Sequence, residues 1–311
     1  MKNDTVDILL ATFNGFAFIA SQLDSILSQS HKEIHLIIRD DLSTDSTRKI
    51  LETYANRFPE MITLLPSEAQ LGVKGNFSHL MERAKADYIM FADQDDVWEE
   101  EKVGRTLERM KGLEQKYCSD IPLLVHTDLK VVDRDLNVLS PSLWSYSGIE
   151  PSKGQTLNRL LMQNVVTGCT MMINRSLLTL GSPVPESAIM HDWWLALVAA
   201  AFGKVETLPE ATMLYRQHGK NTLGARKFLS LSNFRYGMGR INKQETAKQL
   251  HATELLKRYF YLLSSHQKQL LKAFNKLPRA SFPQKAFLIL RYRFFKMGFI
   301  RNAVNILVKT Q

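Results

Sequence analysis

The stretch YIMFADQDD, residues 88–96, decides the fold. Its first five residues are apolar or aromatic, as in the strands of a parallel sheet that is buried on both faces. The run leads directly into Asp93-Gln94-Asp95-Asp96, where three of four side chains are carboxylic acids. In open α/β sheets, ligands bind beyond the carboxyl ends of the strands. A buried strand that ends in such a cluster therefore predicts a sheet of this kind with a binding site at its edge.

The residues before this stretch alternate between apolar runs and helical patterns. They predict strands at Val6–Thr12, Ile34–Ile38 and Met61–Leu65, helices that carry Ile19–Leu27 and Ile50–Tyr54, a glycine-containing turn at Gly72–Gly75, and a helix rich in Glu and Lys after Asp96. Ser43 or Thr44 is expected to cap the second helix. This alternation predicts a mostly parallel sheet with helices on both faces.

The pattern changes beyond residue 120. It predicts short strands at Leu123–His126, Val131–Val132 and Thr170–Ile173, a polar loop at Ser140–Lys153, a buried helix at His191–Phe202 that Gly203 ends, and a strand-like run at Glu210–Leu214. Residues 226–311 lack strand signals and predict two to four helices. There Phe287, Leu290, Phe294 and Met297 are expected to share one helical stripe.

The composition indicates an ordinary globular protein. The chain has 311 residues, 45% hydrophobic and 23% charged, which excludes collagen-like and wholly disordered classes. No apolar run is long enough for a spanning helix, and the first residues do not look like a signal peptide. The two cysteines, Cys118 and Cys169, form no disulfide framework, which fits a reducing cytoplasm.

The charge is distributed unevenly along the chain. Residues 226–311 hold 18 Lys and Arg but only two acidic residues, whereas residues 1–225 carry a net charge of −7. This asymmetry predicts two parts, a domain at 1–225 and a basic helical region at 226–311.

Polar residues follow each of the first four predicted strands. The segments are Thr12–Gly15, Asp40–Asp45, Leu71–Asn76 and Asp93–Asp96. Because the carboxyl ends of parallel strands lie at one edge, these segments are expected to converge there.

The acidic cluster at 93–96 is the sharpest signal. Three carboxylates within four residues are costly to hold together unless a cation neutralises them. Oxygen ligands favour Mg²⁺ or Mn²⁺ over zinc. The alternative is a solvated turn in which an Asp stabilises a helix N-terminus. Its position at a strand end favours the metal.

Other polar residues are ambiguous when taken one at a time. Asp192 opens an apolar helix and is either an N-terminal cap or a general base beside two indoles. Lys74 can meet a phosphate, Arg216 can clamp a diphosphate and His218 can ligate a metal, but each is also typical of a surface residue. The chain has no P-loop, G-x-S-x-G or G-x-G-x-x-G motif.

Taken together, the motifs resemble a known family. Thr-Phe-Asn at 12–14, Asp-Asp-x-Ser-x-Asp at 40–45, Leu-Gly-x-x-x-Asn at 71–76 and Asp-Gln-Asp-Asp at 93–96 occur in the order found in the family 2 glycosyltransferases with the GT-A fold. The resemblance covers about residues 5–225. The segments HTDLKVVDRDLNVLSPS, NVVTGCTMMINRSL, MHDWWLALVAAAFGKV and LYRQHGKNTLGAR are similar to bacterial rhamnosyltransferases of cell-wall polysaccharide synthesis.

The resemblance implies a role for each matching position. Nucleobase and ribose contacts fall on Thr12, Asn14 and Asp41, diphosphate contacts on Lys74, Asn76 and Arg216, metal contacts on Asp93, Asp95 and His218, and the general base on Asp192. Asp93 reaches the nucleotide sugar through the metal. Phe13 replaces the more usual Tyr, and the Q-x-x-R-W motif of processive synthases is absent, which favours the addition of one or few sugars. Trp144 and Trp193 are candidates for stacking on sugar rings, as is Trp194, for which a core role is comparable.

The implied activity is an inverting transfer of a sugar that depends on Mn²⁺ or Mg²⁺. The resemblance implies L-rhamnose, from dTDP-β-L-rhamnose, and a lipid-linked saccharide as acceptor. The alternatives are a transferase for UDP-linked galactose, glucose or N-acetylglucosamine on the same scaffold, and a non-catalytic protein that binds nucleotide sugars or a membrane surface.

The basic C-terminal region has two competing interpretations. It is either a helical cap on the catalytic domain or a docking element for an anionic membrane surface, and either is compatible with a homodimer. The second interpretation places a cytoplasmic protein on the inner face of the cell membrane. No recognised module supports nucleic-acid binding.

Overall fold

The computed structural model describes residues 4–218 and 238–298, and these contain one nine-stranded sheet. The strand order is β3-β2-β1-β4-β8-β6-β9-β5, and β7 pairs with β6. The strands are β1 (Val6–Thr12), β2 (Ile34–Asp40), β3 (Ile62–Leu65), β4 (Tyr88–Ala92), β5 (Val97–Trp98), β6 (Leu123–Val132), β7 (Val138–Ser140), β8 (Met171–Asn174) and β9 (Lys204–Arg216). The α-helices are α1 (Ile19–Leu27), α2 (Thr47–Arg57), α3 (Gly72–Arg83), α4 (Lys102–Tyr117), α5 (Leu143–Ser147), α6 (Leu157–Met162), α7 (Arg175–Gly181), α8 (His191–Phe202), α10 (Met238–Arg258), α11 (Ser265–Lys276) and α12 (Phe282–Tyr292). Three short 3₁₀ helices occupy Pro151–Lys153, Gly168–Thr170 and Leu277–Arg279.

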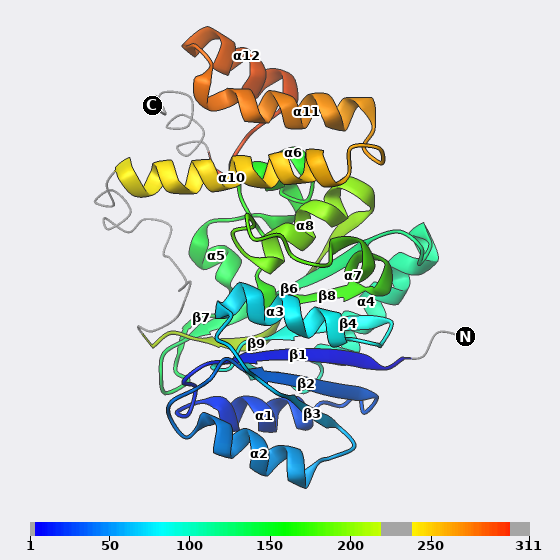
Figure 1. The fold of residues 1–311 in the computed structure, drawn as a ribbon, viewed down its shortest axis with the longest axis vertical. Helices are drawn as coiled ribbons and strands as arrows, with labels where there is room; N and C mark the ends of the chain where they lie inside the picture. The colour runs from blue at the N-terminus through cyan, green and yellow to red at the C-terminus, as the bar shows by residue number, and fades with distance from the viewer. Residues whose placement is uncertain (1–3, 219–237, 299–311) are drawn as a thin grey trace.

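The first four strands are parallel, as predicted. Strand β1 lies between β2 and β4, with Val6 opposite both Ile34 and Tyr88, and β3 joins β2. The carboxyl ends of β1, β2 and β4 therefore meet at one edge of the sheet (Figure 1).

The other half of the sheet mixes directions. Strand β8 is antiparallel to both β4 and β6, whereas β9 runs parallel to β6 with two irregularities in register. Strand β5 directly follows the acidic cluster and pairs with β9. The end of β9 is thereby brought next to the end of β4.

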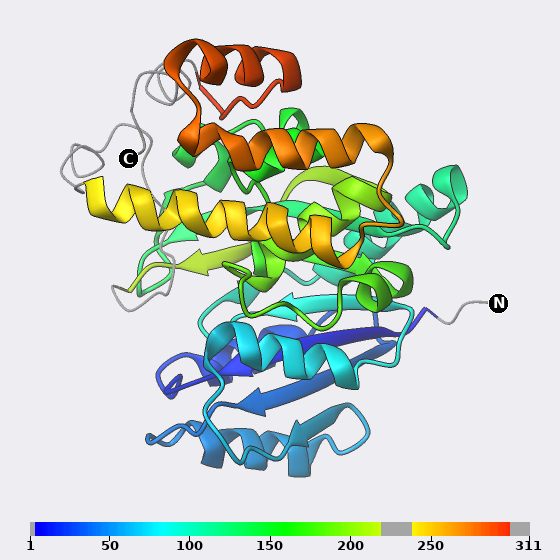
Figure 2. The same cartoon turned by 45° about the horizontal axis from the view of Figure 1, so that its top comes forward.

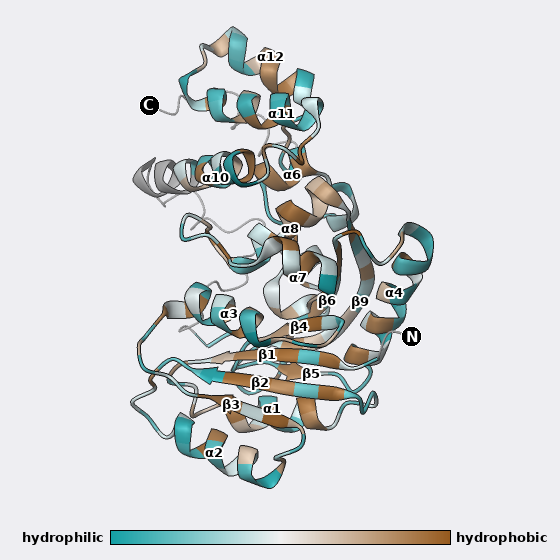
Figure 3. Ribbon diagram, turned by 45° about the vertical axis from the view of Figure 1, so that its right-hand side comes forward, coloured by the Kyte–Doolittle hydropathy of each residue, from teal (hydrophilic) through white to brown (hydrophobic). Residues whose placement is uncertain are grey.

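Helices cover both faces of the sheet. Along β1, the side chains of Ile8 and Leu10 belong to an apolar cluster with residues of α1, α2 and α4, while that of Leu9 belongs to a second cluster with residues of α3 and α8. This alternation is the ordinary period of a strand, and it divides the interior into two apolar layers. Figure 3 shows the strands as mostly brown ribbons between helices that are teal on their outer sides.

Several local predictions are corrected by the structure. Gly72–Gly75 forms the first turn of α3, and Ser46, not Ser43 or Thr44, precedes α2. The two strands predicted between residues 123 and 132 are one strand, β6. The loop predicted at 140–153 contains α5 and a 3₁₀ helix.

The described C-terminal residues form three α-helices and one short 3₁₀ helix, within the predicted range of two to four helices. Ala252 and Leu255 of α10 belong to the same apolar cluster as α8, and α11 and α12 lie outside α10 (Figures 1 and 2). The predicted stripe is wrong. Helix α12 ends at Tyr292 because Arg293 adopts a left-handed conformation with φ of 54°, so Phe294 turns inward while Phe287 and Leu290 stay exposed.

The division into two parts stays a prediction. The boundary at residues 225 and 226 lies outside the described residues. Within the part of the chain that the structure describes, no helix combines the length and the apolar character needed to cross a membrane.

Gly203 offers a test of the packing between α8 and the sheet. A Cβ atom at this position would lie 1.7 Å from the carbonyl oxygen of Pro122, which belongs to the backbone and cannot give way. We expect Gly203→Ala to lower the free energy of unfolding by about 3 kcal/mol. Thermal or urea unfolding measures this change.

Gly112→Ala is the matched control. Gly112 lies inside α4, where a Cβ atom would have no neighbour within 4 Å, and alanine favours a helix interior over glycine by about 1 kcal/mol. We expect this variant to be as stable as the native chain or more so. Equal stability of both variants would contradict the described contact between Gly203 and Pro122.

Candidate active site

A cavity of about 580 Å³ lies at the edge where β1, β2 and β4 end. It brings together most of the residues that the sequence singled out: Thr12, Asn14, Asp41, Asn76, Asp93, Asp95, Asp192 and His218. The remaining lining residues are Ala11, Phe13, Ala17, Phe18, Val73, Phe77, Gln94, Arg134, Thr167, Gly168, Met190, His191 and Tyr215. Five predicted residues, Lys74, Trp144, Trp193, Trp194 and Arg216, are not among those that line it.

The acidic cluster is crowded and poorly solvated. Burial, followed by the charges of Asp95 and Asp192, raises the pKa of Asp93 to about 7. Asp96 is fully buried, its pKa is raised well above the usual range by burial and by Asp95 and Asp93, and neither of its carboxylate oxygens accepts a hydrogen bond of ordinary geometry from the described residues. Asp93, Asp96 and Cys169 each present one atom within 4.8 Å of the others.

These groups fit a divalent cation with a preference for oxygen ligands. A cation would neutralise carboxylates that otherwise repel one another. The Cys169 thiol is buried, and burial together with Asp96 and Asp93 raises its pKa well above the usual range. The carboxylate oxygens of Asp93 and Asp96 outnumber this single thiol among the groups that could hold an ion. The donor set therefore suits Mn²⁺ or Mg²⁺ better than Zn²⁺.

The end of β9 lies against this cluster. His218 Nε2 and Asp95 Oδ2 are 2.7 Å apart, and the Arg216 guanidinium donates to the carbonyl oxygens of Asp95, at 3.0 Å, and Arg134. The Arg216 guanidinium also lies 4.8 Å from the centre of the Phe18 ring. The residues predicted to act together at the ends of β4 and β9, Asp95, Arg216 and His218, are thus in contact. Arg216 holds the backbone of the loop after β4 and does not line the cavity.

Asp192 enters the cavity from the first turn of α8. Its carboxylate accepts hydrogen bonds from the backbone N–H of Trp193, at 2.6 Å, and from Asn164 Nδ2, at 3.3 Å. Burial raises the pKa of Asp192 to about 6. The neighbouring His191 ring lies 4.1 Å from that of Phe77 and 5.1 Å from that of Phe91, and burial lowers its pKa to about 3. A neutral His191 therefore adds no charge beside Asp192.

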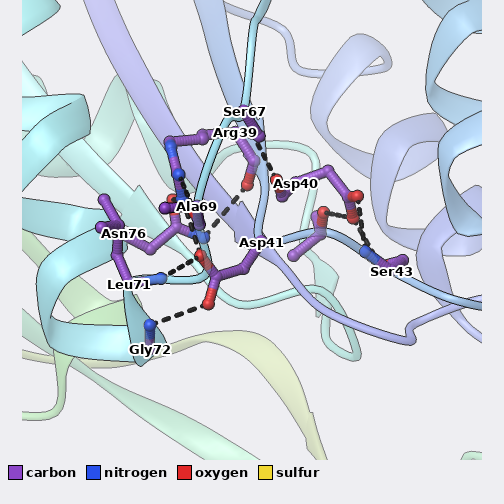
Figure 4. Close-up of polar contacts among 10 residues, drawn as sticks. Arg39, Asp40, Asp41, Ser43, Ser67, Ala69, Leu71, Gly72 and Asn76 are labelled. Carbon is purple, nitrogen blue, oxygen red and sulfur yellow. Dashed lines mark hydrogen bonds and ion pairs between the residues drawn. The ribbon is translucent and has the colours of Figure 1, made fainter.

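The first and second strands end in a hydrogen-bonded network. Both carboxylate oxygens of Asp41 accept backbone N–H groups at the start of α3, from Leu71 at 2.7 Å and Gly72 at 2.8 Å (Figure 4). The Arg39 guanidinium bridges Asp41, at 2.8 Å, and Asn76, at 3.1 Å. These contacts fix Asp41 and Asn76 at the cavity wall.

The loop after β1 is tied to its neighbours in the same way. Thr12 donates its hydroxyl to Asp40 at 2.9 Å, and Asn14 Oδ1 accepts the backbone N–H of Thr44 at 2.8 Å. Gln94 bonds both the N–H and the carbonyl of Phe13, at 2.8 and 3.0 Å, and so links the ends of β1 and β4. The exposed Phe13 ring remains at the cavity mouth.

Lys74 points away from the predicted diphosphate site. Its ammonium donates to the carbonyl oxygens of Glu186 and, at 3.0 Å, Ala188, in the loop that leads into α8. In this structure Lys74 therefore holds the loop before Asp192, and a contact with a diphosphate would require its side chain to turn.

Of the three tryptophans proposed for sugar stacking, Trp193 and Trp194 lie in the interior, which bears out the core role for Trp194. Trp193 is buried, and its indole N–H donates to the carbonyl of Leu160 at 2.7 Å. Trp144 is half-buried and packs edge-on against the fully buried His126. The buried rings of Trp193 and Trp194 are not available to a sugar in this geometry, whereas stacking by the half-buried Trp144 stays a prediction.

The sequence did not identify some residues of the site. Asn164 and Cys169 both lie in NVVTGCTMMINRSL, the segment similar to rhamnosyltransferases, but the sequence analysis gave neither of them a role. Gln94 and Asp96 lie within the acidic cluster, where their position between two Asp residues and before β5 was a usable signal. His191 adjoins Asp192 but has the pattern of a core residue.

Comparison with known proteins identifies the class. The family whose model matches is Glycosyl transferase family 2, over residues 7–179. The dTDP-rhamnosyl transferase RfbG of Shigella flexneri is 30% identical over 236 residues, which cover 70% of this chain and 74% of that protein. The chain belongs to glycosyl transferase family 2 and is a glycosyltransferase.

Solved structures confirm the fold. S. aureus TarS 1–349 in complex with UDP-GlcNAc superposes with a TM-score of 0.57 at 15% identity, over 93% of this chain and 80% of that one. The mannosyltransferase PcManGT from Pyrobaculum calidifontis, in complex with GDP-Man and Mn²⁺, gives a TM-score of 0.54 at 15% identity, over 94% and 77%. The α/β architecture is thus the GT-A fold, with added C-terminal helices.

The acidic cluster predicts the metal dependence of nucleotide binding. We expect Asp93→Asn and Asp96→Asn each to weaken Mn²⁺ binding at least about tenfold in the presence of dTDP or UDP, because each removes a charge that the cation would balance. The measurement is a titration of Mn²⁺ followed by electron paramagnetic resonance. Glu108→Gln, on the exposed side of α4, is the control and should bind as the native chain does. Unchanged Mn²⁺ affinity in folded Asp93→Asn would rule out a metal at this cluster.

Proposed function

We propose that the protein transfers L-rhamnose from dTDP-β-L-rhamnose to a lipid-linked saccharide, with inversion at the anomeric carbon. The observation that carries the reaction class is one cavity lined by both the acidic cluster and the carboxylate of Asp192. Support for the donor comes from the 30% identity with a dTDP-rhamnosyl transferase.

In this proposal the nucleotide binds along the ends of β1, β2 and β4. Thr12, Asn14 and Asp41 contact the nucleobase and ribose, and Asn76 lies near the diphosphate. Their support is that all four line the cavity and are held by bonds to neighbouring strands. Such bonds fix the site before the donor arrives, which lowers the entropic cost of binding.

We assign the metal to Asp93 and Asp95, with His218 beside them and Asp96 behind. A divalent cation held there supplies positive charge that stabilises the departing diphosphate. Arg216 holds the backbone of Asp95 in place through its bond to that carbonyl. Oxygen donors bind both Mn²⁺ and Mg²⁺, so a metal titration must identify the cation.

Asp192 is the proposed general base. It accepts the proton of the acceptor hydroxyl while the oxygen of that hydroxyl forms a bond to the anomeric carbon. The bond from that carbon to the phosphate oxygen breaks, and its electron pair leaves with dTDP. A pKa raised to about 6 makes Asp192 a better base than an exposed carboxylate while it stays ionised at neutral pH.

The acceptor places the protein at a membrane. A lipid-linked saccharide is presented at the inner face of the cell membrane, where a cytoplasmic protein can meet it by peripheral contact through its basic C-terminal region. In this proposal the division at residue 225 separates a catalytic domain from that contact region.

The alternative donor is a UDP-hexose, since TarS 1–349 binds UDP-GlcNAc on the same fold. Thermal unfolding with dTDP, UDP or GDP, each with and without Mn²⁺, separates the two. A nucleotide at 100 times its dissociation constant stabilises the folded state by about 2.7 kcal/mol, or roughly 5 °C in unfolding temperature. We expect the largest metal-dependent shift with dTDP. A larger shift with UDP would overturn the donor and keep the reaction class, and no shift with any nucleotide would count against catalysis.

Asp192→Asn tests the base. We expect about a 10²–10⁴-fold fall in kcat with the dTDP affinity retained, because the amide cannot accept the proton. For the native enzyme, the carboxylate must be ionised. The rate should therefore fall about tenfold per pH unit below pH 6 and level off above pH 7.

Asn164→Asp and Glu108→Gln serve as controls. Asn164→Asp adds a second negative charge beside Asp192, so the midpoint of the rate profile should move to higher pH. Glu108→Gln should leave the profile unchanged. A kcat of Asp192→Asn equal to that of the native enzyme would remove Asp192 from this role.

A further inference from the structure

The outer layer of the C-terminal region carries solvent-exposed apolar side chains. Between α10 and α11 the chain turns through Phe260, Tyr261 and Leu262, of which Tyr261 is 95% exposed and Leu262 64% exposed. On α12, Phe287 and Leu290 are 63% and 66% exposed. These five residues and the exposed Phe282, at the start of α12, are together called the C-terminal apolar surface. The turn and the start of α12 lie at opposite ends of α11 (Figures 1 and 2), so the surface has two parts.

This surface is not a by-product of a poorly packed helix. Ile289 of α12 is buried, whereas Pro283, Phe287 and Leu290 follow the i, i+4, i+7 spacing of one helical stripe and are exposed. The helix therefore has an inner apolar side against α11 and an outer apolar side without a described partner. Exposed apolar patches of this kind are typical of surfaces that bind a partner.

The charges around the surface select the kind of partner. The last acidic residue of the chain is Glu254, so from residue 255 onward every ionised side chain is basic or histidine. Arg291 is exposed on α12, beside Leu290, and the Lys268 ammonium lies 4.5 Å from the centre of the Phe260 ring. Exposed Lys257, Lys272 and Arg279 lie in α10, α11 and the 3₁₀ helix that precedes α12. Aromatic and aliphatic side chains among cations, with no carboxylate, match the interface of an anionic bilayer.

The position of the surface is compatible with this partner. Helices α11 and α12 form the outermost layer of the molecule, at the end opposite α2 (Figures 1 and 2). The carboxyl ends of β1, β2 and β4 point to a different side of the molecule (Figure 1). A flat bilayer in contact with α11 and α12 would therefore not cover the edge at which the cavity lies.

We propose that the C-terminal apolar surface docks on an anionic phospholipid bilayer, with Tyr261, Leu262, Phe287 and Leu290 entering the interface. The inference deepens the proposed function and rests on it, because it identifies which face meets the membrane that would hold the lipid-linked acceptor. The basic side chains supply attraction to the headgroups, and the apolar side chains supply burial that salt does not screen.

The test is cosedimentation of the full chain with vesicles, without donor or acceptor. We expect binding to equal parts of phosphatidylglycerol and phosphatidylcholine, and little binding to phosphatidylcholine alone. Tyr261→Ser with Leu262→Ser, and separately Phe287→Ser with Leu290→Ser, should each weaken binding at least about fivefold. Thermal unfolding checks that both variants remain folded.

The matched control is Val138→Ser with Leu139→Ser in β7, where the two side chains are 58% and 54% exposed but lie outside the surface. This variant should bind vesicles as the native chain does. Equal binding by all variants would overturn the proposal, and equal binding to neutral and anionic vesicles would overturn the role of charge.

Two further measurements distinguish the bilayer from a second copy of the chain, and the docking surface from the donor site. If the surface joins two copies of the chain, light scattering will show a dimer that the serine variants dissociate, and the membrane proposal is then wrong. Metal-dependent stabilisation by dTDP, measured without vesicles, reports on the proposed function alone. If dTDP gives no stabilisation while the chain still binds vesicles, the result counts against the proposed donor. If dTDP stabilises the chain but the chain does not bind vesicles, the result counts against the docking surface.

Discussion

The burial of β4 between β1 and β8 is the constraint on which the site depends. All five of its residues are buried, and the pairings with β1 and β8 run in opposite directions. The chain therefore leaves the sheet at Ala92 already surrounded, and the acidic residues that follow are crowded together, with Asp96 fully buried and Asp93 and Asp95 half-buried at the cavity wall. Carboxylates in such an environment either take up protons or gather a cation. The raised pKa of Asp93 is the consequence of this crowding, and it makes the cluster a strong site for positive charge without any special side-chain geometry.

What could be predicted from the sequence was the part that local periodicity encodes. The runs at 6–12, 34–38 and 88–92 are apolar because both faces of those strands are covered, so the parallel half of the sheet and its polar edge followed directly. The merging of two predicted strands into β6, the two-residue strand β5 and the parallel pairing of β6 with β9 depend on contacts between residues about 80 apart or more, which no local pattern records. The same limit applies to the site. The position of Asp192 was predictable, whereas the direction of Lys74 and the approach of Asn164 were not, because both are set by segments distant in sequence.

The C-terminal helix α10 helps to hold the loop before α8, a role that the charge distribution did not suggest. Lys74 bonds the same loop. The loop before α8 is held from several sides: Lys74 bonds the carbonyls of Glu186 and Ala188, His251 of α10 accepts the N–H of Ile189 at 2.7 Å, and Arg258 donates to the carbonyls of Ser182 and Pro183. His251 must be neutral to accept that bond, and burial, with the nearby charge of Lys74, lowers its pKa to about 4. Because the loop leads directly into His191 and Asp192, α10 takes part in placing the carboxylate at the cavity. The basic region is thus structurally joined to the catalytic site, even though its sequence looks like an appendage.

The C-terminal region carries more positive charge than its own carboxylates can balance. Residues 226–311 contain only two carboxylates, and one of them, Glu245, already pairs with both Lys248 and Lys296. Two carboxylates cannot neutralise 18 basic side chains, so mutual repulsion would destabilise the helices if the charge had no external partner. The inner sides of α10 and α11 overcome this repulsion with apolar contacts to α8, through residues such as Ala252, Leu255 and Phe274. In the proposed docking, the repulsion that remains on the outer side is relieved by the negative charge of a lipid headgroup layer, and the exposed apolar side chains are buried in the same contact.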